Sequence, residues 1–180
     1  WLKDTVTGHI LLSTNERSGL EVLYFDADLK LDPKAMAFDR LEIRTPHSSL
    51  GNRFVMHYDD FLDDMADFER RVRLEGDFRN SSIRLSDLSC FAPDLKGWDS
   101  DFRVDGRVEG IVEDLTVTGF TTRYGLDTEL KGDFRFQGLP DLDMTRMSFL
   151  GKRLHTSYRD AVSFVPALAD LKTPDLASLA

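Results

Sequence analysis

The sequence is poor in the residues that build covalent cross-links and metal sites. It has one cysteine, Cys90, which excludes an internal disulfide but does not settle the compartment. Its four histidines, His9, His47, His57 and His155, are scattered and form neither a His-Glu-x-x-His motif nor a His/Cys pair. We therefore expect no metal and no cofactor, and we interpret Cys90 as a small buried apolar residue.

Catalytic and nucleotide-binding motifs are also missing. The sequence has no Gly-x-Ser-x-Gly, no phosphate-binding glycine loop and no dinucleotide fingerprint. Two acidic clusters fail the pattern of a calcium loop, because residues 59–67 follow helical spacing and Arg103 interrupts the cluster at 99–105. We interpret the first cluster as a solvated helix face and the second as the solvent-exposed side of a strand. We expect the protein not to be an enzyme.

An excess of positive charge and long apolar runs are absent as well. The formal net charge of −9 disfavours nucleic acid or an anionic membrane surface as the main partner. No run of about 18 apolar residues occurs, so no segment is predicted to span a bilayer. Because the sequence begins without Met or a signal peptide, we expect a fragment cut at both ends from a longer protein, with any anchor outside it.

What the sequence does contain is a strict alternation of charged and apolar residues, which is the period of a strand with one apolar and one polar face. The clearest stretch is 71–79, and the pattern recurs at 101–109 and 129–136. Each copy has a glycine on its apolar side, which would let the sheet curl or bring a ligand close to the backbone. The candidate lining of an apolar groove is Val72, Leu74, Phe78, Phe102, Val104, Val108, Leu130, Phe134 and Phe136.

Other segments alternate less strictly. Strands are expected at 1–12, 21–31, 36–43, 50–55, 100–109, 111–124, 127–138 and 142–150, with a bulge near Asp39 and Arg40. A hairpin turn is predicted at 80–82, and short helical inserts are predicted near 59–70, 86–95 and 157–170. The expected anchors of the last two inserts, and of the return into the next strand, are Phe91, Leu95, Trp98, Phe164 and Leu168.

These patterns predict a mainly β fold. We expect an elongated antiparallel meander, curled into an open β-groove (a β-taco) with an apolar concave face and short helical inserts. Residues 1–180 would form one fragment of a longer repeat array. Because almost every strand is only half apolar, one face of the sheet should lie in water. The alternative is an ordinary core, sealed by a second sheet or by the helices.

Three strings carry a resemblance to a known family. They are Phe-Ala-Pro-Asp-Leu-Lys-Gly-Trp at 91–98, Leu-x-Gly-x-Phe-x-Phe-x-Gly-Leu-Pro-Asp at 130–141, and the helix at 59–68 that leads into the strand at 72–74. Together they resemble TamB-like proteins, the inner-membrane-anchored component of the translocation and assembly module, within the AsmA-like superfamily. The resemblance covers most of residues 20–170.

The resemblance implies a fold and a function. Members of the family are long β-sheets rolled into an open trough that bridges the inner and outer membranes across the periplasm. We therefore expect a periplasmic segment of an inner-membrane-anchored bridge that moves phospholipid acyl chains along an apolar groove. The alternative is a chaperone-like scaffold for outer-membrane β-barrel proteins, acting through edge-strand pairing. An Omp85-family partner would then be contacted by regions outside this fragment.

Overall fold

The fold is given by a computed structural model that describes residues 4–15, 21–90, 96–97, 99–141 and 143–164. The strands are β1 (Val6–Asn15), β2 (Glu21–Asp32), β3 (Ala35–Arg44), β4 (Ser49–His57), β5 (Arg73–Arg84), β6 (Asp101–Ile111), β7 (Asp114–Tyr124), β8 (Thr128–Gln137) and β9 (Arg146–His155). The helical segments are α1 (Phe61–Ala66), α2 (Phe68–Arg71), the 3-10 helix η1 (Leu85–Cys90) and α3 (Tyr158–Phe164).

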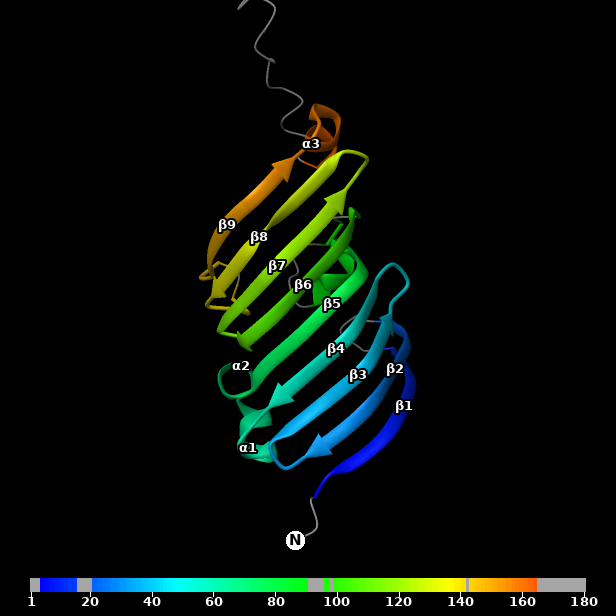
Figure 1. The fold of residues 1–180 in the computed structure, drawn as a ribbon, viewed down its shortest axis with the longest axis vertical. Coiled ribbons are helices and arrows are strands. Elements are labelled where there is room, and N and C mark those ends of the chain that lie inside the picture. The colour runs from blue at the N-terminus through cyan, green and yellow to red at the C-terminus, as the bar shows by residue number, and fades with distance from the viewer. Residues whose placement is uncertain (1–3, 16–20, 91–95, 98, 142, 165–180) are drawn as a thin grey trace, which may run out of the picture.

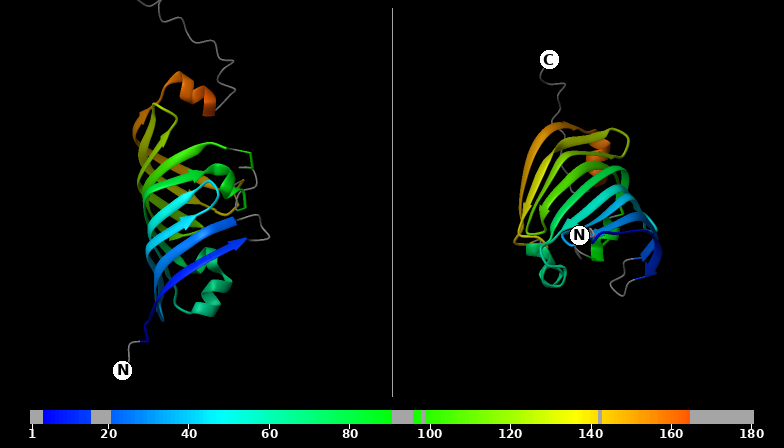
Figure 2. Two further views of the ribbon diagram at one scale, coloured as in Figure 1. Left: turned by 90° about the vertical axis from the view of Figure 1, so that its right-hand side faces the viewer. Right: turned by 60° about the horizontal axis from the view of Figure 1, so that its bottom comes forward.

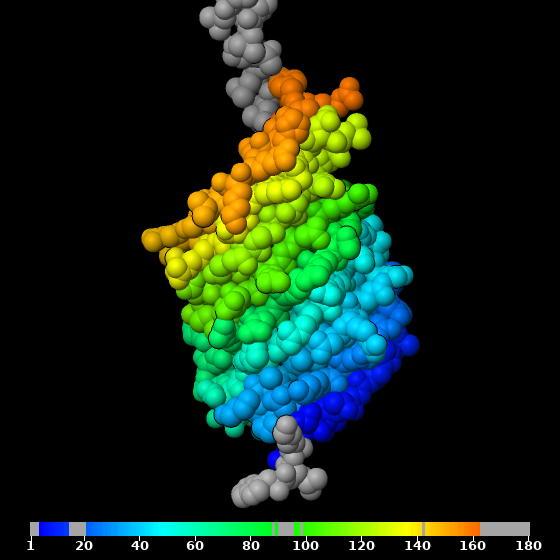
Figure 3. Space-filling view, in the orientation of Figure 1, coloured from blue at the N-terminus to red at the C-terminus, as the bar shows by residue number. Residues whose placement is uncertain are grey.

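The nine strands form one open antiparallel sheet in which every strand pairs with its neighbours in sequence. This confirms the mainly β meander. Figure 1 shows the strands as successive diagonals along the long axis, with β1 and β9 at the two ends. The helical segments lie to one side of the sheet (Figure 2, left). Figure 3 shows the face that they leave uncovered, on which the strands follow one another as diagonal bands.

The register aligns apolar residues in rows that cross the whole sheet. One row, in strand order, is Gly8, Leu29, Phe38, Phe54, Gly76, Val108, Val117, Phe134 and Phe149. The next row is Val6, Leu31, Met36, Met56, Leu74, Gly110, Leu115, Phe136 and Met147. Directly opposed residues share a face, and strands lie about 4.8 Å apart, so each row is about 40 Å long.

β-Bulges keep these rows aligned. The register shifts place one extra residue in each of β3, β5, β7 and β9, at Arg40, Asn80, Gly119 and Lys152. The bulge predicted near Asp39 and Arg40 is thereby confirmed. The first three of these residues have positive φ angles of 52°, 52° and 61°, a conformation that glycine and asparagine tolerate best.

The hairpin turn predicted at 80–82 is wrong, because β5 continues through it to Arg84. Asn80 takes the bulge conformation, and its backbone N–H donates to Asp105 Oδ1 on β6 at 2.6 Å. The bulge returns Ser81 and Ile83 to the apolar side, where they pair with Val104 and Phe102. Polar residues that suggest a turn here serve a bulge instead.

Several boundaries differ from the expected ones. The helix expected near 59–70 is two short helices that meet at Asp67. The strand expected at 71–79 begins at Arg73, since the N–H of Val72 still bonds to Phe68 in α2. The last strand begins at Arg146 rather than at 142, because Asp141 accepts the N–H groups of Asp143 and Met144 in a turn.

Candidate functional site

The apolar side of the sheet carries an open cavity of about 730 Å³ between β5 and β9. Its wall is made mostly of aliphatic and aromatic side chains of the strands, and η1 and α3 contribute residues to the lining. The lining residues are Ile83, Leu85, Phe102, Val104, Phe120, Thr122, Tyr124, Thr128, Leu130, Phe134, Phe136, Met147, Leu154, Thr156, Asp160 and Ala161. We refer to this hollow as the apolar cavity.

The cavity brings together part of the predicted set. Phe102, Val104, Leu130, Phe134 and Phe136 line it. The other four predicted residues lie beyond it: Val72 and Leu74 are buried, while Phe78 and Val108 are partly exposed. Of the expected insert anchors, Phe91, Leu95, Trp98 and Leu168 lie outside the described residues, and so do the side chains of Phe164 and Cys90.

Sequence reasoning missed several of the lining residues. Ile83 follows residues 80–82, for which the sequence predicts a turn, but β5 continues past the bulge at Asn80 and includes it. Phe120 and Tyr124 fall out of alternation with Val117 because the extra residue Gly119 shifts the period. Where the alternation of apolar residues resumes one residue late after Asn or Gly, the pattern indicates a bulge, and the apolar residues after it still belong to the same face of the strand.

Phe134 is the centre of an aromatic cluster within the cavity. Its ring stacks on Phe149 with a centroid distance of 4.5 Å and an interplanar angle of 27°. Phe120 meets it edge to face at 5.1 Å, and Phe136 stacks at 5.9 Å. Such pairs add about 0.5–1.5 kcal/mol each beyond the area they bury. Phe120, Phe134 and Phe136 therefore give the cavity an aromatic wall on β7 and β8, and Phe149 of β9 packs against it.

At two of the three glycine positions of the apolar face, Gly76 and Gly132, no room is left for a ligand close to the backbone. The alternative expectation, that these glycines let the sheet curl, stays a prediction. A Cβ at Gly76 would lie 2.6 Å from the ring of Phe78, and one at Gly132 would lie 2.3 Å from the ring of Phe149. The space above each of these glycines is filled by a neighbouring aromatic ring. A third glycine, Gly106, faces only ordinary contacts with Phe120 and Val117.

Helix α3 is fastened at one end of the cavity by Asp160. This carboxylate is 4% exposed and accepts hydrogen bonds from the backbone N–H groups of Asp127 at 2.8 Å and Thr128 at 2.9 Å. The Thr128 hydroxyl donates to it at 3.0 Å. These donors, with Asp127 first, hold the pKa of Asp160 below its ordinary value. The turn between β7 and β8 is thereby tied to α3.

The other helical segments are fastened by buried or half-buried aspartates. In η1, Asp87 accepts from the hydroxyl of Ser48 at 2.7 Å and from that of Thr45, in the turn before β4. Burial raises the pKa of Asp87, but hydrogen bonds from Ser48, Thr45 and His47 outweigh it and lower the pKa. Asp87 in η1 and Asp160 in α3 thus each fix a helical segment to a turn of the sheet.

The acidic cluster at 59–67 is only partly the solvated helix face that its spacing predicts. Asp64 is 2% exposed and accepts the backbone N–H of Asp59 at 2.6 Å and that of Asp60 at 3.1 Å. Arg71 Nε lies 2.9 Å from its other oxygen. The backbone donors, Asp59 first, lower the pKa of Asp64. This carboxylate is a structural cap on the entry to α1.

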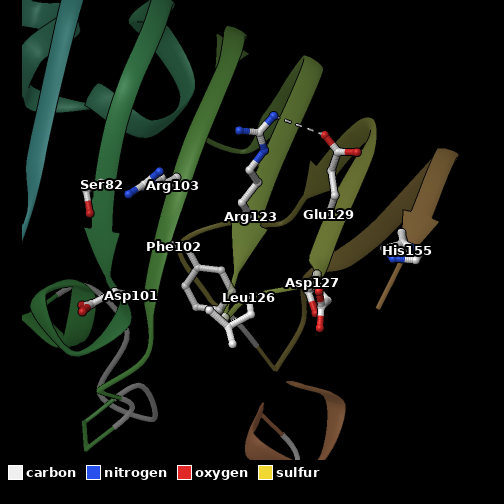
Figure 4. A pocket seen from close by; sticks show the side chains of 11 residues that line it. Ser82, Asp101, Phe102, Arg103, Arg123, Leu126, Asp127, Glu129 and His155 are labelled. Atoms are coloured by element: carbon white, nitrogen blue, oxygen red, sulfur yellow. Dashed lines mark ion pairs between the residues drawn. The ribbon is translucent and has the colours of Figure 1, made fainter. Parts of the chain in front are cut away.

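A second hollow, of about 700 Å³, lies among polar side chains at the ends of β6 to β9 (Figure 4). Arg103 and Arg123 face each other directly across β6 and β7, and Arg123 lies 3.6 Å from Glu129. Both arginines are exposed. Lys131 is the nearest donor to Glu129 and, with Arg153 and Arg123, lowers its pKa. These are solvated cross-strand charges rather than an enclosed site.

The described residues contain no group of three or more His, Cys, Asp or Glu side chains placed to hold a metal ion. Within the same ranges, none of the helices has the length and apolar content needed to cross a bilayer. Comparisons of the chain with protein-family models, with curated proteins and with solved structures found no match. The family resemblance therefore stays a prediction.

Proposed function

We propose that the apolar face binds the acyl chains of phospholipid and that the chain is a lipid-transport segment of a TamB/AsmA-like periplasmic bridge. The apolar cavity carries this proposal, because it is open and its wall is almost wholly hydrocarbon. Binding rather than catalysis is the activity that such a surface supports.

The two apolar rows extend the cavity into a surface as long as the sheet. Each methylene group removed from water contributes roughly 0.8 kcal/mol, so an acyl chain can be held by many weak contacts. An acyl chain held in this way can move from one strand to the next without having to escape from a deep free-energy minimum. The repeating rows supply equivalent contacts at about 4.8 Å intervals.

The same residues could instead form an ordinary sealed core, and their exposure argues against that alternative. Leu12, Met147, Phe149 and Leu154 belong to the apolar side and are 43%, 61%, 44% and 70% exposed. The described part of the chain supplies no second sheet, since all nine strands belong to one. Apolar side chains that remain in contact with water are available to a ligand.

A fluorescent fatty acid and a charged variant test the proposal. Leu130→Asp puts a carboxylate into the cavity wall, whereas Leu126→Asp makes the same change in a turn where the leucine is 83% exposed. We expect Leu130→Asp to weaken probe binding at least about tenfold, because a buried charge must be desolvated. Leu126→Asp should bind as the unchanged chain does.

Mass spectrometry of lipid extracted from the purified protein gives a second readout. Phospholipid should copurify with the unchanged chain and with Leu126→Asp, and it should be depleted from Leu130→Asp. Circular dichroism establishes that both variants keep the sheet. The proposal is wrong if the unchanged chain takes up neither the probe nor phospholipid, or if folded Leu130→Asp binds as tightly as its control.

A further inference from the structure

Strand β9 is the most exposed strand of the sheet. All ten of its residues are exposed, and one of its two edges pairs with no strand among the described residues. A ten-residue edge offers its free backbone N–H and C=O groups to another extended chain. The apolar row ends here at Phe149, and Met147 and Leu154 lie on the same side. A tenth strand would cover these side chains and extend both rows.

The polar side of β9 has charge of a single sign. The strand contains Arg146, Lys152 and Arg153 and no acidic residue, in a chain whose net charge is −9. Lys152 Nζ lies 2.6 Å from Asp133 on β8, and Arg153 Nε lies 3.4 Å from Glu129. Arg146 lies opposite Gln137 and forms no ion pair within the described ranges. Within the described ranges, the basic side chains of β9 thus form ion pairs only with acidic residues of β8.

The bulges of the sheet define what should meet β9 on its free side. The bulge in β5 donates the N–H of Asn80 to Asp105 on the strand that follows. The bulge in β7 repeats this arrangement, with the N–H of Gly119 donating to Asp133 at 2.8 Å. In β9 the extra residue is Lys152, and the sheet itself provides no following strand among the described residues. The bulge in β3 departs from this arrangement, because the strand that follows Arg40 presents Asn52 and Arg53 there. By analogy with the bulges in β5 and β7, we expect an acidic residue opposite the bulge in β9.

We propose that β9 receives an antiparallel strand from a partner polypeptide, in which apolar and acidic residues alternate and one acidic residue lies opposite Lys152. The partner's apolar side chains would continue the rows, and its carboxylates would pair with Arg146 and Arg153. Every ladder in the sheet is antiparallel, which fixes the direction.

A second copy of the chain is a poorer source of this strand. In a fully overlapped antiparallel pair of β9 strands, Arg146 would lie opposite His155 and Arg153 opposite Ser148, so no carboxylate would meet the basic residues. Strand β1 carries only Thr7, His9, Leu11 and Ser13 on its polar side and so has no carboxylate to offer either. The basic residues of β9 therefore favour an acidic partner over β9 or β1 of a second copy.

Hydrogen exchange on the full chain tests the proposal, with a synthetic peptide as the probe. The peptide Glu-Val-Leu-Tyr-Phe-Asp-Ala-Asp-Leu-Lys-Leu-Asp has the sequence of β2, in which one side is apolar and the other carries three aspartates and one lysine. In the control peptide, lysine replaces the aspartates corresponding to Asp26 and Asp28. The acidic peptide should protect the amides of residues 146–155, and the control should bind about tenfold more weakly.

A matched pair of protein variants locates the contact. Arg146→Glu should weaken binding of the acidic peptide about threefold, whereas Arg103→Glu makes the same charge change within the sheet and should leave binding unchanged. The proposal is overturned if protection appears only at β1 or β3, if both peptides bind equally, or if the β9 amides that face away from β8 are already protected in the free chain.

Discussion

The two faces of this sheet come from the same strands but are stabilised by different forces. On the apolar side, the rows of aliphatic and aromatic residues exclude water, and Phe134 packs against three other rings. On the other side, opposite charges meet across neighbouring strands, as in Arg53 with Asp39 at 2.8 Å and Arg84 with Asp101 at 2.7 Å. Hydrophobic contacts are non-directional, whereas a cross-strand ion pair forms only where the register places opposite charges side by side.

This difference assigns separate roles to the two faces. Burial of apolar area provides most of the free energy of folding, so changes on that face should be costly. Exposed ion pairs each contribute little. A slip of one residue would carry the whole apolar set of a strand to the other face of the sheet, so the apolar alternation is what specifies register. The apolar face therefore supplies stability, register and the proposed binding surface, and the polar face adds weak cross-strand ion pairs. Three predictions, with the largest effect first, test this division.

Val72→Ala should give the largest loss of stability. Val72, between α2 and β5, is fully buried, so removing two methyl groups leaves a cavity and should lower the free energy of unfolding by about 2 kcal/mol. The control is Val6→Ala in β1, where the valine is 62% exposed and the change should stay below about 0.5 kcal/mol. Urea denaturation measures both. Equal losses would show that burial does not set the stability of this sheet.

Asp160→Asn should loosen the attachment of α3 with a smaller effect on the sheet. Since the pKa of Asp160 is lowered by folding, its contribution is present above the ordinary carboxyl value and is lost as the pH falls through the lowered value. Amide resonances of Asp127 and Thr128 followed by NMR should therefore shift as the pH falls below the ordinary carboxyl range.

Asp127→Asn is the control for this titration, because the Asp127 side chain is exposed in the same turn. It should leave the acid transition in place, whereas Asp160→Asn should remove the transition and give the low-pH spectrum at neutral pH. A transition that persists in Asp160→Asn would assign the attachment of α3 to another group.

The pair formed by Arg135 and Asp114 should have the smallest effect. Arg135 donates from Nε at 2.7 Å and from Nη2 at 2.6 Å, but the two side chains are 52% and 40% exposed. A double-mutant cycle with Arg135→Gln and Asp114→Asn should give a coupling of at most about 1 kcal/mol that falls in high salt. A salt-independent coupling above about 2 kcal/mol would give the polar face a stabilising role that we do not expect.

Much of the fold could be predicted because the alternation of residues is local. The strands at 101–109 and 129–136 were located from period two alone, since Phe102, Val104, Leu130 and Phe134 fall on one side whichever strands they pair with. The sequence predicts a turn at Asn80, whereas the structure has a bulge there, because asparagine is favoured in both. Only the presence of Asp105 on the neighbouring strand decides between them.

The position of the candidate site was less predictable, because it depends on residues that lie on neighbouring strands or far away in the chain. Phe120 and Tyr124 join the cavity only because Gly119 shifts the period of β7. Asp160 is far in sequence from the turn that it holds, and nothing in its neighbourhood indicates its burial. Contacts between distant segments are set by packing and leave no local pattern in the chain.

The sequence by itself determined that this protein is built from strands with one apolar and one charged side, because side-chain direction on a strand follows from backbone geometry alone. The tertiary structure alone decided which apolar residues gather in the cavity, which aspartates are buried and which edge remains exposed. The physical reason is that register, bulges and helix attachment depend on hydrogen bonds and packing between residues that are far apart in the chain.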